Sequence, residues 1–483
     1  MGKITNFDDL VAVGDAESRR VVLTIADRVL QRLDAYQRIR SIMCLDGDLL
    51  TVGTKTWDLS TKRHVYLIGA GKACNHMAMA VDHVLGDRLT RGIAIVKIAE
   101  ESDRFGRTEV YVGGHPLPNE SGHQASLEIL ELADNAGPDD LFIAVISGGS
   151  SALMSCPIDG VSLEDEQRAT DVLLKSGAGI YEINAIRRHI SQTNGGMLAK
   201  RIAASGAELI GIGISDAVGN RPTGDIAVPY AAYASTPIGR DTTTLADARR
   251  VIADYDLADR LPASIVSYLA SVGEEGETPK AFPDNTYYLL NTLPDSCRYA
   301  QEVAEELGLN ALILTSFLEG ESRDAGTFFA SLAREIQARG TPIEAPCVLI
   351  AAGETTTTIL DNAKITGHGG PGHELTAGFA ISAAKAPGAV ALSIDTEGTD
   401  GTTSAAGGLC DSTTLARARA AGVDLHAALR GHATHEALGA IGDIIVTGNT
   451  GTNLCDLNLV YVPAPTVPQQ TPTVPQQAPR SDS

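Results

Sequence analysis

The sequence predicts an α/β protein built from two α/β domains, and the pattern of its apolar segments is the main reason. Short, continuously apolar segments recur along the 483 residues, and most are followed at once by Gly, Ser, Asn or Asp. Longer helix-like stretches separate them, and this alternation is typical of mostly parallel sheets covered on both faces. The predicted strands are Val65–Ile68, Leu141–Ile146, Leu209–Ile214, Tyr287–Leu290, Ala311–Leu314, Val348–Ala352, Ala389–Ile394 and Ile444–Val446.

Composition supports a folded chain of this class. Hydrophobic residues make up 43% of the chain and charged residues 20%, which excludes a largely disordered protein. The 49 glycines suit many tight strand-to-helix turns. We expect a Rossmann-like, mostly parallel domain over residues 1–280 and a smaller C-terminal α/β domain over residues 285–462, with a cleft between them. Residues 463–483 repeat Thr-Val-Pro-Gln-Gln and should form a disordered tail.

The acidic balance limits the partners of the chain. Its 38 Lys and Arg against 60 Asp and Glu give a formal net charge of −22, which repels nucleic acid and anionic membrane surfaces. No apolar run approaches the ~18 residues of a membrane span, and the N-terminus lacks a signal-peptide pattern. Seven scattered cysteines without a Cys-x-x-Cys pair fit a reduced, cytoplasmic protein. A small anionic substrate remains compatible if a few cations gather at one site.

Ligands of parallel sheets bind beyond the carboxyl ends of the strands, so the residues closing each strand are candidates for a site. The strand Val65–Ile68 runs into Gly69-Ala-Gly71-Lys72. Backbone N–H groups, a helix start and a mobile cation at this turn suit an anion. It is no Walker A loop, because Tyr66 stands where the first glycine belongs and Ala73 follows the lysine. A plain strand-turn-helix junction with a solvated lysine is the alternative.

Two further strand ends carry polar residues. The turn Ser147-Gly148-Gly149-Ser150 offers N–H and hydroxyl donors to phosphate oxygens, or is a tight turn without a ligand. Asp216 closes the strand Leu209–Ile214. A carboxylate there can hold Mg²⁺ or take a proton from a substrate hydroxyl, or it caps the following turn.

A cation cluster stands out in the acidic chain at Arg187, Arg188 and His189. Helical spacing places Asn184, Arg187 and Arg188 on one face of a predicted helix. An ion-paired surface helix and a substrate-binding face are both open readings of this pattern.

Taken together, these motifs resemble the glycerate 2-kinase family, whose C-terminal region is called the MOFRL domain. The similarity covers about residues 15 to 462 and rests on segments that follow one another in the family's order. They are GAGKA at 69–73, GGHPLPNESG at 113–122, ISGGSSAL at 146–153, SGAGIYEINAIRRHIS at 176–191, ISDAVGN at 214–220, LEGESRDAG at 318–326, AAGETTTTI at 351–359, TEGTDGTTSAAGG at 396–408 and TGNTGTNLCDL at 447–457.

The resemblance implies an enzyme that uses ATP and Mg²⁺ to phosphorylate the 2-hydroxyl of D-glycerate, with a homodimer as an open option. It implies Lys72, Asp216 and Arg187 as catalytic residues, with Asp216 also a metal ligand. The implied substrate-binding residues are Ser147, Glu182, Asn184, His189, Glu321 and Arg323. The implied nucleotide-binding residues are Gly69, Gly71, Gly148, Gly149, Ser150, Gly353, Glu354, Thr355, Gly369, Gly370, Thr447, Gly448, Thr450, Gly451 and Asn453.

One departure from the family bears on the substrate. The family reads Gly-Gly-Arg-Asn-x-Glu where this chain has Pro371 in place of the arginine and His373 two residues later. Loss of a guanidinium removes a bidentate anion contact, which His373 is expected to replace in part as a cation near pH 6. A longer acid such as a four-carbon aldonate is therefore an alternative substrate, and Pro371 together with Asn194 also leaves an inactive sugar-acid-binding protein open. A hydroxypyruvate reductase, a label that the family has attracted, is a further alternative. Cys74, at the third glycine of a dinucleotide fingerprint, counts against the reductase.

Overall fold

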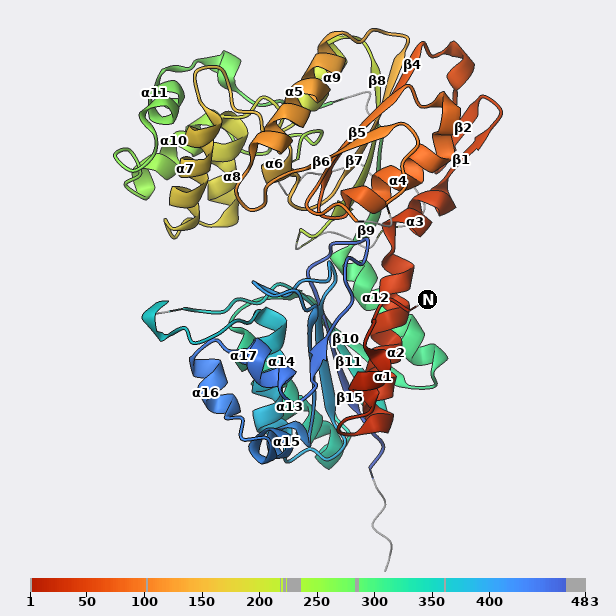
Figure 1. The fold of residues 1–483 in the computed structure, drawn as a ribbon, viewed down its shortest axis with the longest axis vertical. Coiled ribbons are helices and arrows are strands. Elements are labelled where there is room, and N and C mark those ends of the chain that lie inside the picture. Colours follow the sequence, from red (N-terminus) through yellow and green to blue (C-terminus); the bar gives the residue numbers. More distant parts are fainter. Residues whose placement is uncertain are drawn as a thin grey trace, which may run out of the picture.

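The computed structural model describes residues 2–100, 103–217, 219, 223, 236–282, 286–359 and 362–465, and two six-stranded sheets organise them. Each sheet is the centre of one lobe, and the two lobes are stacked along the long axis of the molecule (Figure 1). The first lobe is the sheet that contains β4–β9 and the helices packed on it, and the second lobe is the sheet that contains β10–β15 with its helices. This arrangement confirms the predicted fold class.

The first sheet has the strand order of a Rossmann fold. Its strands run in the order β6-β5-β4-β7-β8-β9, and every neighbouring pair is parallel. The order reverses between β4 and β7, and such a switch point is where open parallel sheets bind their ligands. The strands are β4 (His64–Gly71), β5 (Arg91–Val96), β6 (Thr108–Val112), β7 (Asp140–Ile146), β8 (Glu208–Ser215) and β9 (Thr286–Thr292).

Helices bury both faces of this sheet, which explains why its central strands β4, β5, β7 and β8 are mostly apolar. Leu67 and Ile143 pack into the core beneath α4 (Cys74–Leu85), while their neighbours Ile68 and Phe142 pack into the core on the opposite face. That face is covered by α5 (Glu120–Asp134) and α9 (Met197–Ala204). A hairpin sheet of β1 (Met43–Asp46), β2 (Leu49–Val52) and β3 (Lys55–Asp58) lies beside α3 (Ala35–Ile42).

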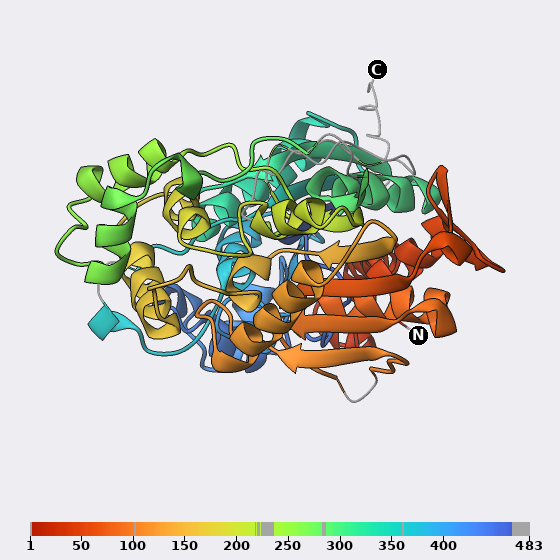
Figure 2. The ribbon, with the colours of Figure 1, turned by 90° about the horizontal axis from the view of Figure 1, so that it is seen from above.

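A separate group of helices extends to one side of the first sheet (Figures 1 and 2). It has its own apolar core, which includes Leu173, Ile186 and Leu269. Its helices are α7 (Leu163–Leu174), α8 (Ile180–His189), α10 (Leu245–Asp254) and α11 (Ala263–Ser271). The predicted helix that carries the cation cluster is therefore confirmed as α8.

The second sheet is mixed. Its order is β10-β11-β15-β12-β13-β14, and only β10 and β11 are parallel neighbours. The C-terminal strand β15 (Asp456–Val462) inserts between β11 (Cys347–Gly353) and β12 (Val390–Asp395). The remaining strands are β10 (Asn310–Leu318), β13 (Gly407–Asp411) and β14 (Ile444–Ile445).

Helices cover the second sheet on both faces as well. On one face lie α13 (Ser322–Arg339) and α14 (Pro371–Ala383), and on the other α2 (Ala16–Leu33) and α12 (Leu293–Glu306). The shorter helices are α1 (Phe7–Val11), α6 (Ser150–Leu153), α15 (Thr414–Ala420), α16 (Leu425–Arg430) and α17 (Thr434–Gly439). In the part of the chain that the structure describes, no helix has both the length and the apolar character needed to cross a membrane.

The two lobes do not correspond to two continuous halves of the chain: a segment before the predicted boundary at residues 280–285 packs on the second lobe, and a segment after it belongs to the first lobe. The N-terminal helix α2 packs on strands β12 and β15 of the second sheet. Strand β9, which begins at Thr286, completes the first sheet. The predicted boundary and the predicted cleft stay predictions, and the predicted tail stays one because residues 466–483 lie outside the described residues.

Candidate active site

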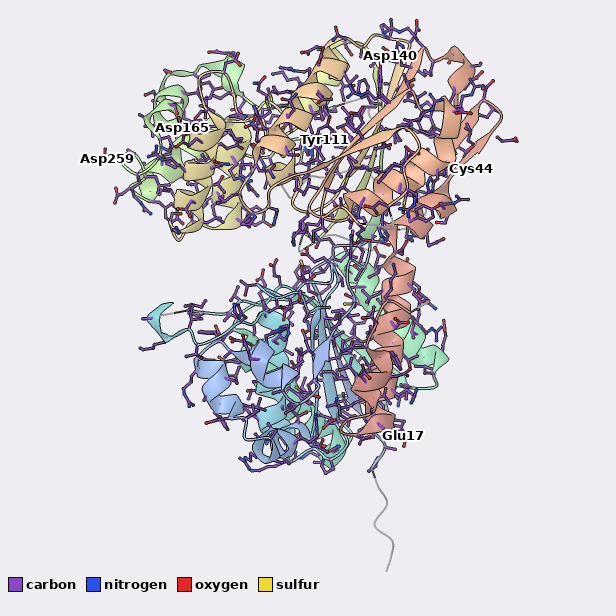
Figure 3. The ribbon with its side chains drawn as sticks, viewed as in Figure 1. Glu17, Cys44, Tyr111, Asp140, Asp165 and Asp259 are labelled. Atoms are coloured by element: carbon purple, nitrogen blue, oxygen red, sulfur yellow. The ribbon has the colours of Figure 1, made fainter. Side chains whose placement is uncertain are left out.

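The carboxyl ends of the strands around the switch point of the first sheet are directed toward the second lobe. Asp140 begins β7 at the end of the first lobe that is far from the second lobe (Figure 3), where Arg63 and His64 bind its carboxylate. In the second sheet, Asp456 at the start of β15 is paired with Gly353 on one side and Asp395 on the other. The ends of β11 and β12 therefore share one edge with the start of β15.

The two glycine-rich turns of the first sheet interlock at the switch point. The backbone N–H of Lys72 donates to the carbonyl of Gly148 at 2.9 Å. The N–H of Ala73 donates to Ser147 Oγ at 3.0 Å, and the N–H of Ser147 donates to the carbonyl of Ala70 at 3.1 Å. The turns that the sequence predicts separately therefore form one surface.

Asp216 lies directly against this surface because Gly148 has no side chain. Asn453 Nδ2 of the second lobe donates to Asp216 Oδ2 at 3.1 Å. A Cβ at Gly148 would stand 2.1 Å from that carboxylate oxygen and 2.3 Å from the amide nitrogen. Burial raises the pKa of Asp216, while the neighbouring charge of Lys72 opposes that shift.

Glu397, which follows β12, joins two lysines of the first lobe. Lys72 Nζ lies 2.6 Å from Glu397 Oε2, and Lys97 Nζ, just after β5, lies 2.8 Å from Glu397 Oε1. Burial opposes the charged form of Lys72, but Glu397 raises its pKa to about 12. Burial likewise opposes ionisation of Glu397, but the two lysines lower its pKa to about 2. Lys72 and Glu397 are therefore both charged at neutral pH.

Lys97 and Glu397 were not predicted as site residues, although both follow the strand-end rule. Glu397 comes two residues after β12, whose apolar run the sequence shows clearly. Lys97 comes directly after β5, a strand that was missing from the predicted set. Recognising Arg91–Val96 as a strand would have found it.

Cations surround His115, which stands between β6 and α5. Burial lowers the pKa of His115 to about 4, and the charges of Lys72, Lys97 and Arg187 act in the same direction while Glu397 opposes them. Arg187 is a half-buried residue of α8, and it has no hydrogen bond or ion pair with any of the described residues. The few cations that an acidic chain needs for an anionic substrate thus gather here.

Carboxylates dominate the opposite, second-lobe side. Burial raises the pKa values of Asp395 and Asp456 well above the ordinary range, and the negative charges of neighbouring carboxylates raise both values further. Cys455 Sγ donates to the backbone carbonyl of Asp216 at 3.6 Å and to Glu354 Oε2 at 3.8 Å. Glu354, at the end of β11, therefore lies near Asp216 of the first lobe.

The loop that contains Thr447, Gly448, Thr450, Gly451 and Asn453 lies between the lobes. The carbonyl of Gly451 accepts from the N–H of Ala35 at 3.1 Å, and Lys3 Nζ donates to the carbonyl of Thr450 at 2.9 Å. Thr450 Oγ1 donates to the carbonyl of Thr396, at the end of β12. Of the predicted nucleotide-binding residues in this loop, Asn453 is the one that contacts Asp216.

Two predicted substrate-binding residues of α8 are not brought to this edge. Glu182 accepts from the N–H of Gly179 and from the hydroxyl of Tyr255, both at 2.7 Å. His189 is fully buried, with Nδ1 at 2.7 Å from the carbonyl of Ala185 and Nε2 at 2.9 Å from Glu277 Oε1. Both side chains are engaged within the helical group. Asn184 is also buried, and its Oδ1 has no partner among the described residues.

Gly369 and Gly370 precede α14, where Asp400 already occupies the helix N-terminus. Its carboxylate accepts from the N–H of Gly372 at 3.2 Å and of His373 at 2.8 Å. The His373 ring is fully buried, contacts Asp400 and has its Nε2 at 3.4 Å from His435 Nδ1. The expectation that His373 replaces the missing arginine as a cation at the site is therefore wrong, since the ring packs inside the second lobe.

Glu321 and Arg323 lie beside the end of β11. Glu321 precedes α13, and its Oε2 accepts from the N–H of Thr358 at 3.2 Å. Ser322 Oγ donates to Thr355 Oγ1 at 2.9 Å, which ties this turn to the Gly353–Thr356 turn. Arg323 is half-exposed, with its Nε 3.7 Å from Glu321 Oε1.

The carboxylates can contribute to a metal site only together with other ligands. Among the residues that the structure describes, no three His, Cys, Asp or Glu side chains converge closely enough to hold a metal ion. Mg²⁺ usually keeps several waters and binds proteins through one or two carboxylates plus substrate phosphates. Asp216 and Glu354, which flank Cys455, fit that donor set.

The fold and the site define a class: two-lobed α/β proteins with two glycine-rich turns and a lysine at a Rossmann switch point. The chain matches the family described as "Domain of unknown function (DUF4147)" over residues 21–270 and the MOFRL family over residues 347–456. It is 37% identical over 450 residues to a glycerate 2-kinase of Pyrococcus horikoshii, covering 92% of this chain and 97% of the relative. A D-glycerate 2-kinase of Thermotoga maritima is 35% identical over 395 residues, covering 81% of this chain and 89% of the relative.

A crystal structure of a Thermotoga maritima glycerate kinase superposes with a TM-score of 0.76 at 31% identity, covering 93% of this chain and 100% of that one. The chain belongs to the glycerate 2-kinase family.

Proposed function

We propose that this protein transfers the γ-phosphoryl group of ATP to the 2-hydroxyl of D-glycerate, giving 2-phosphoglycerate and ADP. One observation carries the proposal: Lys72 and the turn Ser147–Ser150 meet at the switch point, facing Asp216 and the second lobe. The names of the relatives supply the reaction and its acceptor, and the geometry is suited to both.

Phosphoryl transfer requires positioning and cancellation of charge more than covalent chemistry from the protein. The N–H groups of the two turns and the start of α4 can bind phosphate oxygens. Lys72 and Lys97 add two cations next to them, and Glu397 holds both. Lys72 can follow the charge that develops on the transferring group.

The acceptor is an anion, and Arg187 is the cation best placed for it. Within the described residues its guanidinium has no hydrogen bond or ion pair, although the charge of Glu166 acts on it; Arg188, in contrast, is paired with Asp241 at 2.6 Å. A guanidinium matches a carboxylate in a two-point contact. Arg187 therefore binds the glycerate carboxylate in this proposal.

Asp216 and Glu354 would hold the Mg²⁺ that accompanies ATP. A bound Mg²⁺ neutralises charge on the phosphates. Asn453 keeps the Asp216 carboxylate in place through its 3.1 Å hydrogen bond. Burial favours the protonated form of Asp216, and Lys72 favours the charged form that metal binding requires.

The test is an assay of ADP release with D-glycerate, L-glycerate and a four-carbon aldonate, followed by NMR of the phosphorylated product. Phosphate on the 2-oxygen of D-glycerate is the expected result. A faster reaction with the aldonate would mean that the protein is a kinase whose preferred acceptor is the longer acid. Oxidation of NADH by hydroxypyruvate without ADP release would overturn the proposed kinase activity in favour of a reductase. Binding of ATP and glycerate without turnover would indicate an inactive binding protein.

A cytoplasmic location and a homodimer belong to this proposal as well. The seven cysteines are all free thiols, as reducing conditions require. Sedimentation velocity of the full chain would test the homodimer.

A further inference from the structure

We propose that His115 binds the reacting hydroxyl of the acceptor, as a neutral imidazole that accepts its hydrogen bond. This inference rests on the proposed function and adds to the site a residue that none of the assigned roles includes. Three observations support it: the position of the imidazole ring, its two nitrogens without a hydrogen bond to the described residues, and the charges around it.

The ring of His115 reaches the switch point because Gly149 leaves room for it. Gly149 has a φ of +84°, and a Cβ there would lie 3.0 Å from His115 Cδ2 and 3.2 Å from His115 Nε2. The same Cβ would lie 3.2 Å from Lys72 Cγ. The imidazole edge that carries Nε2 therefore lies over the turn that faces the phosphates, next to Lys72.

The ring nitrogens of His115 are available for a ligand. Neither forms a hydrogen bond with any residue in the described ranges, whereas His123, in the helix that follows, has its Nδ1 at 3.1 Å from the carbonyl of Ser155. A half-buried polar group without a protein partner is costly unless water or a ligand binds it. The acceptor is the ligand that the site is proposed to receive.

Burial and the cations around His115 together favour the neutral ring. Lys72, Lys97 and Arg187 disfavour a further positive charge there, while Glu397 acts against them. A neutral imidazole has one nitrogen that accepts a hydrogen bond, and an imidazolium has none. The cations thus preserve the acceptor nitrogen while attracting the carboxylate of the substrate.

The 2-oxygen of glycerate forms a bond to the γ-phosphorus, and the bond from that phosphorus to the bridging oxygen breaks with its electron pair going to ADP. The hydroxyl proton passes to the imidazole nitrogen of His115 and from there to water. Because the transition state of such transfers is loose, a weak base suffices, and orientation of the hydroxyl is the larger contribution.

The decisive variant is His115→Gln, with His83→Gln as its matched control. His83 lies on α4 and contacts Tyr36 and the carbonyl of Arg104, outside the site. His115→Gln should lower kcat/KM for D-glycerate by about 10²-fold, the usual scale for loss of a proton acceptor. The Kd of ADP should stay within about twofold, because in this proposal the ring binds the acceptor and not the nucleotide.

A second measurement does not depend on turnover. In protein labelled with ¹³C-histidine, the resonance that His115→Gln removes should shift when D-glycerate is added with Mg-ADP. It should not shift with 3-hydroxypropionate, which lacks the 2-hydroxyl. Equal shifts with both acids, no shift with either, or an unchanged kcat/KM in the variant would overturn the role of His115 and leave the kinase standing. A wild-type protein that does not phosphorylate glycerate would overturn the proposed function and this role with it.

Discussion

Three features distinguish Lys72 from a solvated surface lysine. Its backbone closes the switch-point turns, its ammonium is bound by a buried carboxylate, and its charge acts on both Asp216 and His115. At the level of single residues, the chemistry proposed here depends most on this side chain.

Lys72→Ala should lower kcat by about 10²-fold or more, because removal of one electrostatic contact to a transition state commonly costs that much. Lys62→Ala is the matched control, since Lys62 pairs with Glu208 at the opposite end of the first sheet. Steady-state kinetics with saturating ATP and D-glycerate provides the measurement. A wild-type kcat in Lys72→Ala would remove this residue from the mechanism.

The pH dependence also belongs to this scale. His115 has a pKa lowered to about 4, so its protonation state does not change between pH 5 and pH 8. The buried His373 offers no cation to the substrate. We therefore expect the KM for D-glycerate to show no improvement as the pH falls from 8 to 6. A KM that decreases through pH 6.5 would point to a histidine cation at the carboxylate.

At the level of elements, the start of α14 forms a regular helix although Pro371 stands where the family resemblance implies an arginine. Pro371 is the first residue of this helix, and the amides of Gly372 and His373 that follow it bind Asp400. Proline suits this position because the first helical turn does not need its missing N–H. The proline thus suits the helix, whereas the cation that the resemblance implies at this position is absent.

Pro371→Arg should improve binding of D-glycerate relative to a four-carbon aldonate. The new guanidinium would start beside Asp400, which is three residues from Glu397 in the chain. We expect a gain of about 1–3 kcal/mol in the relative kcat/KM values, the range for a hydrogen bond to a charged group. Competition between the two acids is the measurement, and Pro371→Gln is the uncharged control. Equal preferences in both variants would show that Arg187 already fills this role.

At the scale of the whole molecule, the two lobes are joined at the site itself. Lys72 and Lys97 of the first lobe share Glu397 of the second, and Asp216 is bound by Asn453. Because the pKa of Glu397 is lowered to about 2, its contribution to stability is complete above the unfolded value near 4.5. That contribution is lost as the pH falls from there toward 2.

Glu397→Gln should lower the free energy of unfolding by about 1–3 kcal/mol at pH 7, because it leaves two half-buried lysines without their anion. Glu306→Gln is the control, since Glu306 is 47% exposed and pairs with arginines at the surface. Denaturant unfolding followed at pH 7 and at pH 3.5 is the measurement. The difference between variant and wild type should be smaller at the lower pH, and a constant difference would argue against the ion pair.

Deletion of residues 466–483 should change neither the melting temperature nor kcat/KM. This segment is rich in Pro and Gln and has few apolar residues with which to bury a core. The deletion keeps Pro463–Pro465, which line a cavity together with Tyr461 and Pro387. Calorimetry and steady-state kinetics test this expectation, and a loss of several degrees would show that the segment binds the body of the protein.

Local sequence patterns were sufficient to predict several of the buried strands, such as β4, β7, β8, β11 and β12, and the residues that close them, although the equally buried β5, β13 and β15 were missed. Lys72, Ser147 and Asp216 were found because a continuous apolar run followed by glycine or a polar residue is a local pattern. The same rule missed β6, an edge strand with half-exposed residues. His115 follows this strand, and for that reason it was not predicted as a site residue. Burial of a strand and the turn that follows it leave a pattern in the local sequence, so both can be predicted without knowing which segments pack against them.

Only the tertiary structure decided which strand ends meet. Lys97 and Glu397 are 300 residues apart, and no pattern in either segment specifies the other. The position of β15 between β11 and β12 likewise follows from long-range pairing, which brings Asn453 to Asp216. The engagement of Glu182 and His189 within the helical group also depends on partners, Tyr255 and Glu277, that are distant in the chain. A side chain's chemistry depends on its neighbours, and packing of the two lobes sets those neighbours.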